Sequence, residues 1–354
     1  MHILITGGAG FVGSHLAISF KEKYPHYKIT CLDNLKRRGS ELNLTRLKAH
    51  SIGFVHADIR NPEDLEGIEP FDCLIDASAE PSVLAGLNSS MTQLINNNLF
   101  GTVNCLELAK KFHAKFIFLS TSRVYPIGSL ESVLASELPT RFTWQPIQTL
   151  LGVSEKGISE DFPLTGSRSF YGATKLASEL LIQEYFSVNN LPTVINRCGV
   201  IGGAGQMGKV DQGFMVLWVA RHYWKQKLNY IGYGGEGKQV RDVLHPTDLF
   251  KLIDLQVHNT ETFAGKTFNV GGGLKNSISL QELTTLCEKS TGNMTLIEKI
   301  KENRPLDLKV YISDYSQIET LCGWSPTIPV SQIVDEITDW IQKNEKMLEP
   351  ILNS

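Results

Sequence analysis

The chain has 354 residues, of which 42% are hydrophobic and 20% are charged, the composition of an ordinary folded globular protein. The formal net charge is −3, no Lys/Arg run stands out and no apolar stretch could span a bilayer, so neither a nucleic acid nor a membrane is an expected partner. The cysteines and histidines show no metal-ligand spacing and no signal peptide is visible, so we expect buried thiols, no metal and a cytoplasmic location.

Short apolar runs alternate with amphipathic segments through the first half of the chain. Strands are expected at residues 2–6, 28–33, 53–56, 73–77, 115–120 and 193–197. Helices are expected at residues 13–23, 98–112 and 171–185. Continuous apolar strands separated by helices predict a parallel sheet covered on both faces, and right-handed crossovers make it a doubly wound α/β layer of the Rossmann type.

The second half is less regular and contains two glycine-dense stretches, at residues 199–213 and 232–237. Helices are expected at residues 214–226, 280–291 and 330–344, and a strand at residues 266–270. We therefore expect a Rossmann domain over residues 1–196, rejoined by residues 237–272. A smaller C-terminal α/β domain over residues 197–354 would bind the substrate.

A glycine loop, Gly-Gly-Ala-Gly-Phe-Val-Gly, follows the first expected strand and opens a helix. Gly7 permits the tight turn, Gly10 lets the backbone approach a pyrophosphate, and Gly13 lets the helix pack closely on the sheet. The helix N-terminus supplies N–H groups and a partial positive charge for that pyrophosphate. The alternative is that these glycines only form turns.

Two carboxylates end the next strands of the expected sheet. Asp33 lies twenty residues after Gly13, where it would hold the adenosine ribose, and Asp58 ends the third strand, within reach of the adenine. The charge of Asp33 would repel the extra phosphate of NADP, so the pattern predicts NAD as the cofactor. Arg37 and Arg38 follow closely and weaken that preference. Alternatively, Asp33 caps a helix.

Tyr171 and Lys175 stand four residues apart in an expected helix, which puts the phenol and the ammonium on one face. A free phenol has a pKa of about 10, and a neighbouring ammonium and a nicotinamide ring would lower it. Tyr171 could then take a proton from a sugar hydroxyl while hydride leaves the same carbon. Thr121 follows the fifth strand and could bind that oxygen, unless it satisfies local backbone instead.

Together these motifs resemble the extended short-chain dehydrogenase/reductase superfamily across essentially the whole chain. The resemblance implies that Thr121, Tyr171 and Lys175 form a catalytic triad and that Asn98 lies near the cofactor. It also implies a wider set of cofactor contacts, namely Phe11, Val12, Asn34, Ile59 and Ala77, and cofactor contacts by Tyr171 and Lys175 beside their catalytic role.

Within the superfamily, the sequence is similar to the tyvelose epimerase (CDP-paratose 2-epimerase) branch at residues 139–143, 209–214 and 235–245, and at Arg123, two residues after Thr121. That branch inverts C2 of a CDP-linked dideoxyhexose and keeps NAD bound between turnovers. A C4 ketone would not acidify C2, so inversion there requires oxidation at C2 itself, rotation of the ketone and return of hydride to its other face.

The residues after Thr121 bear on the other reactions of the superfamily. A 4,6-dehydratase usually carries Asp-Glu directly after the catalytic Thr, where this chain has Ser122 and Arg123, so dehydration is disfavoured. A 4-epimerase uses the same three residues and stays open, as do a reductase that releases NADH and an inactive NAD-binding protein. Residues 76–81, Pro126 and residues 197–203 depart from the expected patterns, so the sugar and the nucleotide also stay open.

A nucleotide-diphosphate sugar requires cations, and Arg241 is the first candidate for its diphosphate or ribose, with Arg304 the second. Both could instead form surface ion pairs. The remaining candidates for substrate binding are Arg123, Arg197, Asp211 and Gln212. By resemblance, the chain is expected to form a homodimer through the helices that begin near residues 98 and 171.

Overall fold

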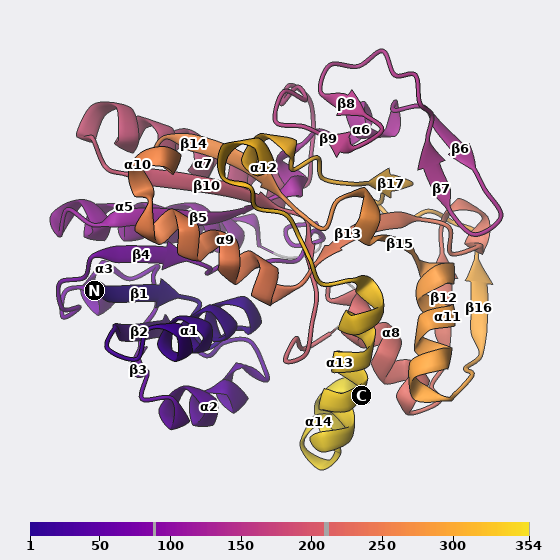
Figure 1. The fold of residues 1–354 in the computed structure, drawn as a ribbon, viewed down its shortest axis with the longest axis horizontal. Helices are drawn as coiled ribbons and strands as arrows, with labels where there is room; N and C mark the ends of the chain where they lie inside the picture. The colour runs from indigo at the N-terminus through magenta and orange to yellow at the C-terminus, as the bar shows by residue number, and fades with distance from the viewer. Residues whose placement is uncertain (88–89, 209–211, 354) are drawn as a thin grey trace. The chain divides into compact units, whose positions relative to one another are not determined.

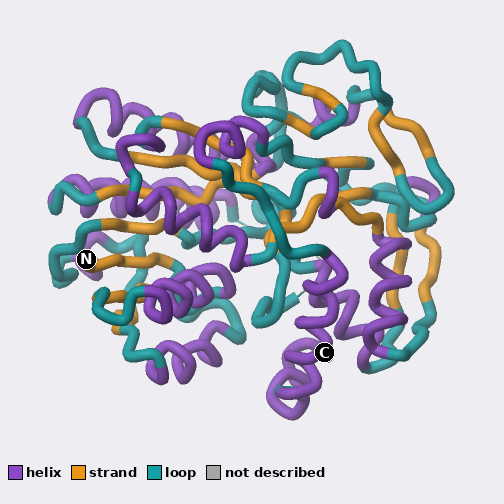
Figure 2. The backbone as a smooth tube through the Cα atoms, viewed as in Figure 1, coloured by secondary structure: helices purple, strands orange, loops and turns teal. Residues whose placement is uncertain are grey.

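The computed structural model describes residues 1–87, 90–208 and 212–353, which divide into two compact units. Unit 1 comprises Met1–Val124, Phe170–Arg197 and Pro246–Phe268. Unit 2 comprises Tyr125–Ser169, Cys198–His245 and Asn269–Ser354. The path of the chain can be followed in the ribbon and in the backbone tube (Figure 1, Figure 2).

A seven-stranded sheet forms the centre of the described part of unit 1, in the order β14-β10-β5-β4-β1-β2-β3. β1 pairs in parallel with β2 and β4, β2 with β3, and β4 with β5. The tips of β10 and β14 belong to unit 2. The strands are β1 (His2–Thr6), β2 (Lys28–Asp33), β3 (Gly53–His56), β4 (Cys73–Asp76), β5 (Lys115–Thr121), β10 (Thr193–Cys198) and β14 (Lys266–Val270). The expected Rossmann-type sheet is confirmed.

Helices cover both faces of this sheet. Figure 1 shows α1 and α9 on one face and α5 and α7 on the other. A π-helical turn over Asn96–Phe100 precedes α5, where the sequence predicted a single helix from residue 98. The helices of unit 1 are α1 (Phe11–Lys23), α2 (Asn43–Ala49), α3 (Pro62–Leu65), α4 (Met91–Ile95), α5 (Gly101–Lys111), α7 (Phe170–Asn189), α9 (Pro246–His258) and α10 (Thr260–Phe263).

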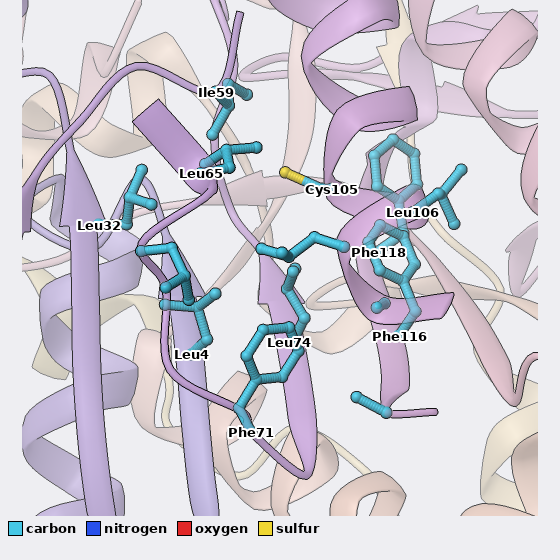
Figure 3. Close-up of a cluster of buried hydrophobic side chains, with 14 of the residues drawn as sticks. Leu4, Leu32, Ile59, Leu65, Phe71, Leu74, Cys105, Leu106, Phe116 and Phe118 are labelled. Atoms are coloured by element: carbon cyan, nitrogen blue, oxygen red, sulfur yellow. The ribbon is translucent and has the colours of Figure 1, made fainter. Parts of the chain in front are cut away.

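The core on the α5 side of the sheet is built from side chains of five strands, β1, β2, β4, β5 and β10, together with helices and loops. Leu4, Leu74 and Phe116 are fully buried there, together with Cys105 and Leu106 of α5 (Figure 3). Burying this apolar area removes it from water and provides the main force that holds the helices on the sheet. Because both faces are covered, the strands appear in the sequence as continuous apolar runs.

Unit 2 has smaller sheets and a group of three helices. β13 pairs with β11, β15 and β17, β12 pairs with β16, and two short hairpins precede them in the chain. The strands are β6 (Ala135–Glu137), β7 (Phe142–Trp144), β8 (Val153–Ser154), β9 (Gly157–Ile158), β11 (Val200–Ile201), β12 (Leu228–Ile231), β13 (Val240–Leu244), β15 (Ser277–Ser279), β16 (Ile297–Ile300) and β17 (Val310–Tyr311). The helices are α6 (Ile127–Glu131), α8 (Phe214–Tyr223), α11 (Leu280–Thr291), α12 (Ser316–Cys322), α13 (Val330–Lys343) and α14 (Glu345–Leu352), of which α8, α11 and α13 pack together.

The observed division differs from the expected one in two places. Tyr125–Ser169 groups with unit 2, because the β6–β7 hairpin is bonded to it: the N–H of Phe142 donates to the carbonyl of Lys238 at 2.9 Å. The segment that rejoins unit 1 is Pro246–Phe268 and not residues 237–272. β13 lies within the expected segment but pairs only with strands of unit 2 among the described residues.

Three further findings concern the described residues alone. None of their helices is long and apolar enough to cross a membrane. They also contain no group of three or more His, Cys, Asp or Glu side chains that could hold a metal ion. The six cysteines are free, and five of them are buried.

Candidate active site

The glycine loop between β1 and α1 leaves no room for a side chain at Gly7 or at Gly13. Gly7 has φ +65°, and a Cβ atom there would lie 2.8 Å from the carbonyl oxygen of Ala77. A Cβ atom on Gly13 would lie 2.2 Å from the carbonyl oxygen of Gly7. Both positions therefore require glycine, for conformation at the first and for close helix approach at the second.

The N-terminus of α1 fits a phosphate group. Gly10 occupies the N-cap position and has no side chain to bind the first N–H groups of the helix, and the first turn contains no acidic residue. Phe11 and Val12 are the first two residues of this helix. Uncapped amides and the helix dipole attract an anion. This end of α1 therefore suits the pyrophosphate of a dinucleotide.

Asp33 lies beside that loop, at the end of β2. Its Oδ2 atom accepts a hydrogen bond from the N–H of Ala9 at 3.1 Å, and its Oδ1 atom accepts one from the N–H of Leu35 at 2.8 Å. Partial burial raises the pKa of the Asp33 carboxyl, and the backbone donors around it oppose that effect. The Asp33 carboxylate thus lies beside the glycine loop, and its contact with a ribose of the cofactor stays a prediction.

Asp58 is held by a neighbour that the sequence interpretation missed. The Arg60 Nε atom lies 2.9 Å from Oδ1 of Asp58, and Asn34 donates to Oδ2 at 3.0 Å. The Arg60 guanidinium lowers the pKa of Asp58 to about 2. An Arg two residues after the Asp was a visible signal. These donors bind both oxygens of the Asp58 carboxylate and leave few lone pairs for a ligand. A contact between Asp58 and adenine stays a prediction.

Ile59 contributes packing inside unit 1. Its side chain is buried, and a Cβ atom on Gly101 would lie 2.5 Å from its Cδ1 atom. Its carbonyl accepts a hydrogen bond from Asn104 at 2.8 Å. The structure therefore gives its side chain and its carbonyl other partners than the expected cofactor.

Asn98 joins the loop after β4 to helix α7. It lies buried in the π-helical turn, a type of irregularity that is frequent at functional sites. Its Oδ1 atom accepts from the N–H of Glu80 at 2.7 Å, and its Nδ2 atom donates to the Glu80 carbonyl at 3.1 Å and to Thr174 at 3.3 Å. Ala77 lies in the same loop, against Gly7.

A fully buried carboxylate supports the loop after β4, and the sequence interpretation did not identify it either. Asp76 is fully buried at the end of β4 and accepts hydrogen bonds from Thr6 at 2.7 Å and from Thr102 at 3.1 Å. The hydroxyl and the N–H of Ser78 donate to it as well. The signal was its place in residues 76–81, which depart from the common pattern of the superfamily.

The three expected catalytic residues lie on elements that contact one another. Thr121 is buried at the end of β5, and its Oγ1 atom accepts from the N–H of Arg123 at 3.2 Å. Tyr171 and Lys175 are buried in the first two turns of α7, which packs against β5 and against the 3₁₀ turn Ser122–Val124. The Lys175 Nζ atom lies 3.8 Å from the centroid of the Phe118 ring.

Arg197 requires a correction. It was expected to bind substrate, but its side chain is buried within unit 1 and forms an ion pair with Glu179, with Nη2 2.8 Å from Oε2. The Arg197 guanidinium is only 5% exposed and donates from both Nε and Nη2 to this buried carboxylate, so it is not available to a ligand. Arg197 is therefore withdrawn from the substrate-binding set.

Of the other candidates for substrate binding, all but Arg123 belong to unit 2. The Nη2 atom of Arg241 lies 2.6 Å from Oδ1 of Asp307, and the Arg241 side chain is 13% exposed. Arg304 is half-buried, and its carbonyl accepts a weak hydrogen bond from the N–H of Asp307 at 3.4 Å. Gln212 is half-buried just before α8, and Asp211 lies outside the described residues. Arg123, in unit 1, is half-buried.

Comparison with known proteins identifies the family. Residues 3–271 match the NAD dependent epimerase/dehydratase family. The chain belongs to this family. Epimerases and dehydratases of the family act on nucleotide sugars with NAD, so the chain is an enzyme with NAD as its cofactor. The glycine loop, the open N-terminus of α1 and Asp33 fit that cofactor.

Relatives within the family catalyse different reactions. The CDP-paratose 2-epimerase of Salmonella typhi is 33% identical, over 96% of this chain and 99% of the relative. The dTDP-glucose 4,6-dehydratase of an Actinoplanes species is 27% identical, over 97% of this chain and 98% of the relative. Membership in the family therefore does not by itself select the reaction.

Solved structures of the family have the same fold. The UDP-glucuronic acid 4-epimerase of Bacillus cereus, in complex with UDP-glucuronic acid and NAD, gives a TM-score of 0.77 at 26% identity and covers 97% of this chain and 99% of its own. The dTDP-glucose 4,6-dehydratase of Bacillus anthracis, in complex with NAD, gives 0.77 at 27% identity and covers 99% of each chain.

Proposed function

We propose that this enzyme is an epimerase that inverts C2 of a CDP-linked deoxyhexose through a transient 2-ketone. The observation that carries epimerisation over dehydration is the 3₁₀ turn Ser122–Val124 after Thr121. A 4,6-dehydratase requires an acid/base pair to eliminate water, and this turn supplies a hydroxyl and a guanidinium where that pair would stand. Arg123 cannot exchange a proton at neutral pH.

The three buried residues of unit 1 divide the chemistry among them. Tyr171, as phenolate, takes the proton of the sugar hydroxyl at C2 and returns it after inversion. The ammonium of Lys175 lowers the pKa of that phenol, and Thr121 donates a hydrogen bond that orients the reacting oxygen. The glycine loop, the N-terminus of α1 and Asp33 would hold NAD, which would supply reversible hydride transfer at C2 without net consumption of cofactor.

The choice of C2 rests on the relative from Salmonella typhi, which aligns over nearly the whole chain at 33% identity. A second candidate, inversion at C4, uses the same residues, and it is favoured by the likeness to the UDP-glucuronic acid 4-epimerase structure. The two reactions differ in the carbon that is presented to Tyr171 and not in the residues that react.

For the substrate, we propose that Arg241 binds the diphosphate with Arg304 as a second cation. The ion pair with Asp307 and a hydrogen bond from Nη1 to the carbonyl of Val240 at 2.7 Å fix the orientation of the Arg241 guanidinium. The remaining N–H groups of the guanidinium are proposed to bind a phosphate oxygen. Gln212 and Arg123 are proposed to form hydrogen bonds with hydroxyl groups of the sugar. Asp211 is retained as a proposal from the sequence.

We also propose that the protein forms a homodimer through α7 and the π-helical turn before α5. Phe100 and Leu180 are 55% and 57% exposed, and these two elements pack together. Phe170, Ala173 and Leu180 form an outward apolar stripe at helical spacing, with Leu181 next to it. An apolar helix face of this kind is typical of a contact with a second copy.

The test is a reaction of the purified protein with CDP-, UDP-, dTDP- and GDP-sugars in heavy water, followed by proton NMR. Inversion at C2 without deuterium uptake is expected, because the same hydride returns to the carbon. Inversion at C4, loss of water or net oxidation would each overturn the proposal and name its replacement. A protein that binds NAD and converts no sugar of the panel would favour an inactive NAD-binding role.

A further inference from the structure

Unit 1 contains a buried ion pair that the reaction scheme does not use. Glu179 and Arg197 have side chains that are 1% and 5% exposed. The Arg197 Nε atom lies 3.1 Å from Oε2 of Glu179 and 3.2 Å from Oε1, and Nη2 lies 2.8 Å from Oε2. The hydroxyl of Ser120 also donates to Oε1. The carboxylate thus has three donors and is almost completely shielded from solvent.

These three side chains connect the elements that carry the reactive groups. Glu179 follows Lys175 by four residues and Tyr171 by eight, so all three lie on one face of α7. Ser120 directly precedes Thr121 on β5, and Arg197 lies on β10. The ion pair therefore fastens α7 to two strands of the sheet, one of which ends in Thr121.

Few other charges face this part of α7. Among the elements that pack against it, α4 and the π-helical turn have no charged residues, and the 3₁₀ turn after β5 contributes Arg123. Glu107 and Lys110 of α5 lie at Tyr185, about four turns beyond Tyr171 along α7. On β5, Lys115 donates to a carbonyl of α9. Of the charged residues on α7, β5 and β10, Lys175, Glu179 and Arg197 are buried. The fully buried Asp76 of β4 is a further carboxylate near this region, and it accepts hydrogen bonds from Thr6 and Thr102.

We propose that Glu179 and Arg197 are positioning residues for the reaction: they hold the face of α7 that carries Tyr171 and Lys175, and their opposite charges cancel, so that the Lys175 ammonium is the one unbalanced buried charge on this face of α7. This inference rests on the proposed role of Tyr171 as the base. A buried ion pair contributes little to the free energy of unfolding compared with an apolar pair of the same shape. A role in balancing charge near Tyr171 is therefore distinct from a role in stability.

The charges of the pair give opposite effects when they are removed one at a time. Eight residues of helix separate Glu179 from Tyr171 by about 12 Å. At that distance, with an effective dielectric constant of about 20, one unbalanced charge shifts the pKa of a phenol by about one unit. Arg197→Met leaves the carboxylate and raises the pKa of Tyr171. Glu179→Gln leaves the guanidinium and lowers it.

The experiment is a tyrosinate absorbance titration of the NAD-loaded protein, with the Tyr171→Phe protein subtracted so that Tyr171 alone is seen. It needs no sugar substrate. Each of the variants is measured in its own Tyr171→Phe background, and thermal unfolding is recorded beside it. We expect a rise of about one unit in Arg197→Met and a fall of about one unit in Glu179→Gln.

Two further variants separate charge from shape. Arg197→Lys keeps the charge and should keep the wild-type titration, while the double variant Glu179→Gln with Arg197→Met removes both charges and should return the titration close to that of the wild type. If one of the two single variants does not fold, the test rests on the other. The pKa of Tyr171 must then be higher than in the double variant for Arg197→Met, or lower than in the double variant for Glu179→Gln.

The outcomes distinguish this inference from the proposed function. Single variants that lower stability but leave the titration of Tyr171 unchanged, or shift it in the same direction, would overturn the charge-balancing role. A wild-type protein in which Tyr171 titrates at the ordinary value of a tyrosine would overturn its role as base, and with it the proposed function.

Discussion

Arg60 donates hydrogen bonds to Asp58 from two of its nitrogens. Its Nε atom lies 2.9 Å from Oδ1 and 3.0 Å from Oδ2 of Asp58, and its Nη2 atom lies 2.5 Å from Oδ2. The carboxylate is 12% exposed, so solvent screens the pair only in part. The pairing lowers the pKa of Asp58 from 3.8 to about 2. A depressed pKa means that the folded state favours the ionised carboxylate, which links this contact to stability.

Arg60→Met should therefore lower the free energy of unfolding at neutral pH by about 1 kcal/mol, after allowance for partial exposure. The contribution of the pair is present above pH 3.8 and is lost as the pH falls through about 2. Urea unfolding of wild type and variant at several pH values measures this. In the control Glu69→Gln, which breaks the exposed pair with Lys28, the change should stay within about 0.5 kcal/mol. Equal losses in both variants would contradict the assignment.

Tyr171→Phe should lower kcat by a factor of about 10² to 10⁴, because the variant has no group to exchange the proton. The affinity for NAD should change little, since the ring is retained. Steady-state kinetics and the amount of NAD that copurifies measure the two effects. The matched control is Tyr185→Phe on the same helix, where the hydroxyl donates to Glu107 near the surface. A comparable loss of kcat in the control would contradict a specific role for Tyr171.

Gly13→Ala should abolish retention of NAD, because the new methyl group would lie 2.2 Å from the Gly7 carbonyl oxygen and force the loop and α1 apart. A clash of this kind also costs about 1–3 kcal/mol of stability. Gly67→Ala is the control, since a Cβ atom there has no atom within 4 Å. Cofactor content after gel filtration and thermal unfolding decide the matter, and retention of NAD by the Gly13 variant would refute it.

Arg241→Ala should raise KM for the nucleotide sugar by about 10-fold to 100-fold, the effect of losing charge-assisted hydrogen bonds of about 1.5–3 kcal/mol, while kcat changes much less. The variant leaves Asp307 unpaired, and that carboxylate would repel a diphosphate. The double variant Arg241→Ala with Asp307→Asn should recover part of the loss. Lys299→Ala, at the exposed pair with Glu236, serves as the control. A change confined to kcat would place Arg241 elsewhere in the reaction.

Leu180→Glu should convert a dimer into monomers, because a charge at the centre of an apolar interface is costly to bury. Light scattering coupled to gel filtration measures the mass. Leu274→Glu, in unit 2, alters a leucine that is 50% exposed and should leave the mass unchanged. A wild-type protein that is monomeric at all concentrations would remove the proposal altogether.

Much of unit 1 was predictable from the sequence. β1, β2 and β3 have the expected bounds, and β4, β5 and β10 differ by one residue at one end. Parallel strands buried on both faces appear as unbroken apolar runs, and glycine or polar residues mark where each one ends. The positions of Asp33 and Thr121 follow from the same rule, since functional residues gather at the carboxyl ends of such strands.

Contacts between distant residues could not be predicted in the same way. The bond from Thr140 to Glu282 spans 142 residues, and no local pattern indicates that Tyr125–Ser169 belongs to unit 2. Arg197 shows a related limit. Every residue of β10 is buried, so alternation along the strand does not reveal which side chains face a ligand and which face α7.

The chain passes five times between the two units, at residues 124–125, 169–170, 197–198, 245–246 and 268–269. Unit 1 takes its edge strand β14 from the last of its segments. On the ribosome, the sheet therefore stays incomplete until about three quarters of the polypeptide has been synthesised, and an open strand edge is a template for unwanted pairing. Nascent chains stalled before residue 266 should accordingly depend on chaperones, and no contiguous fragment of this protein corresponds to either unit.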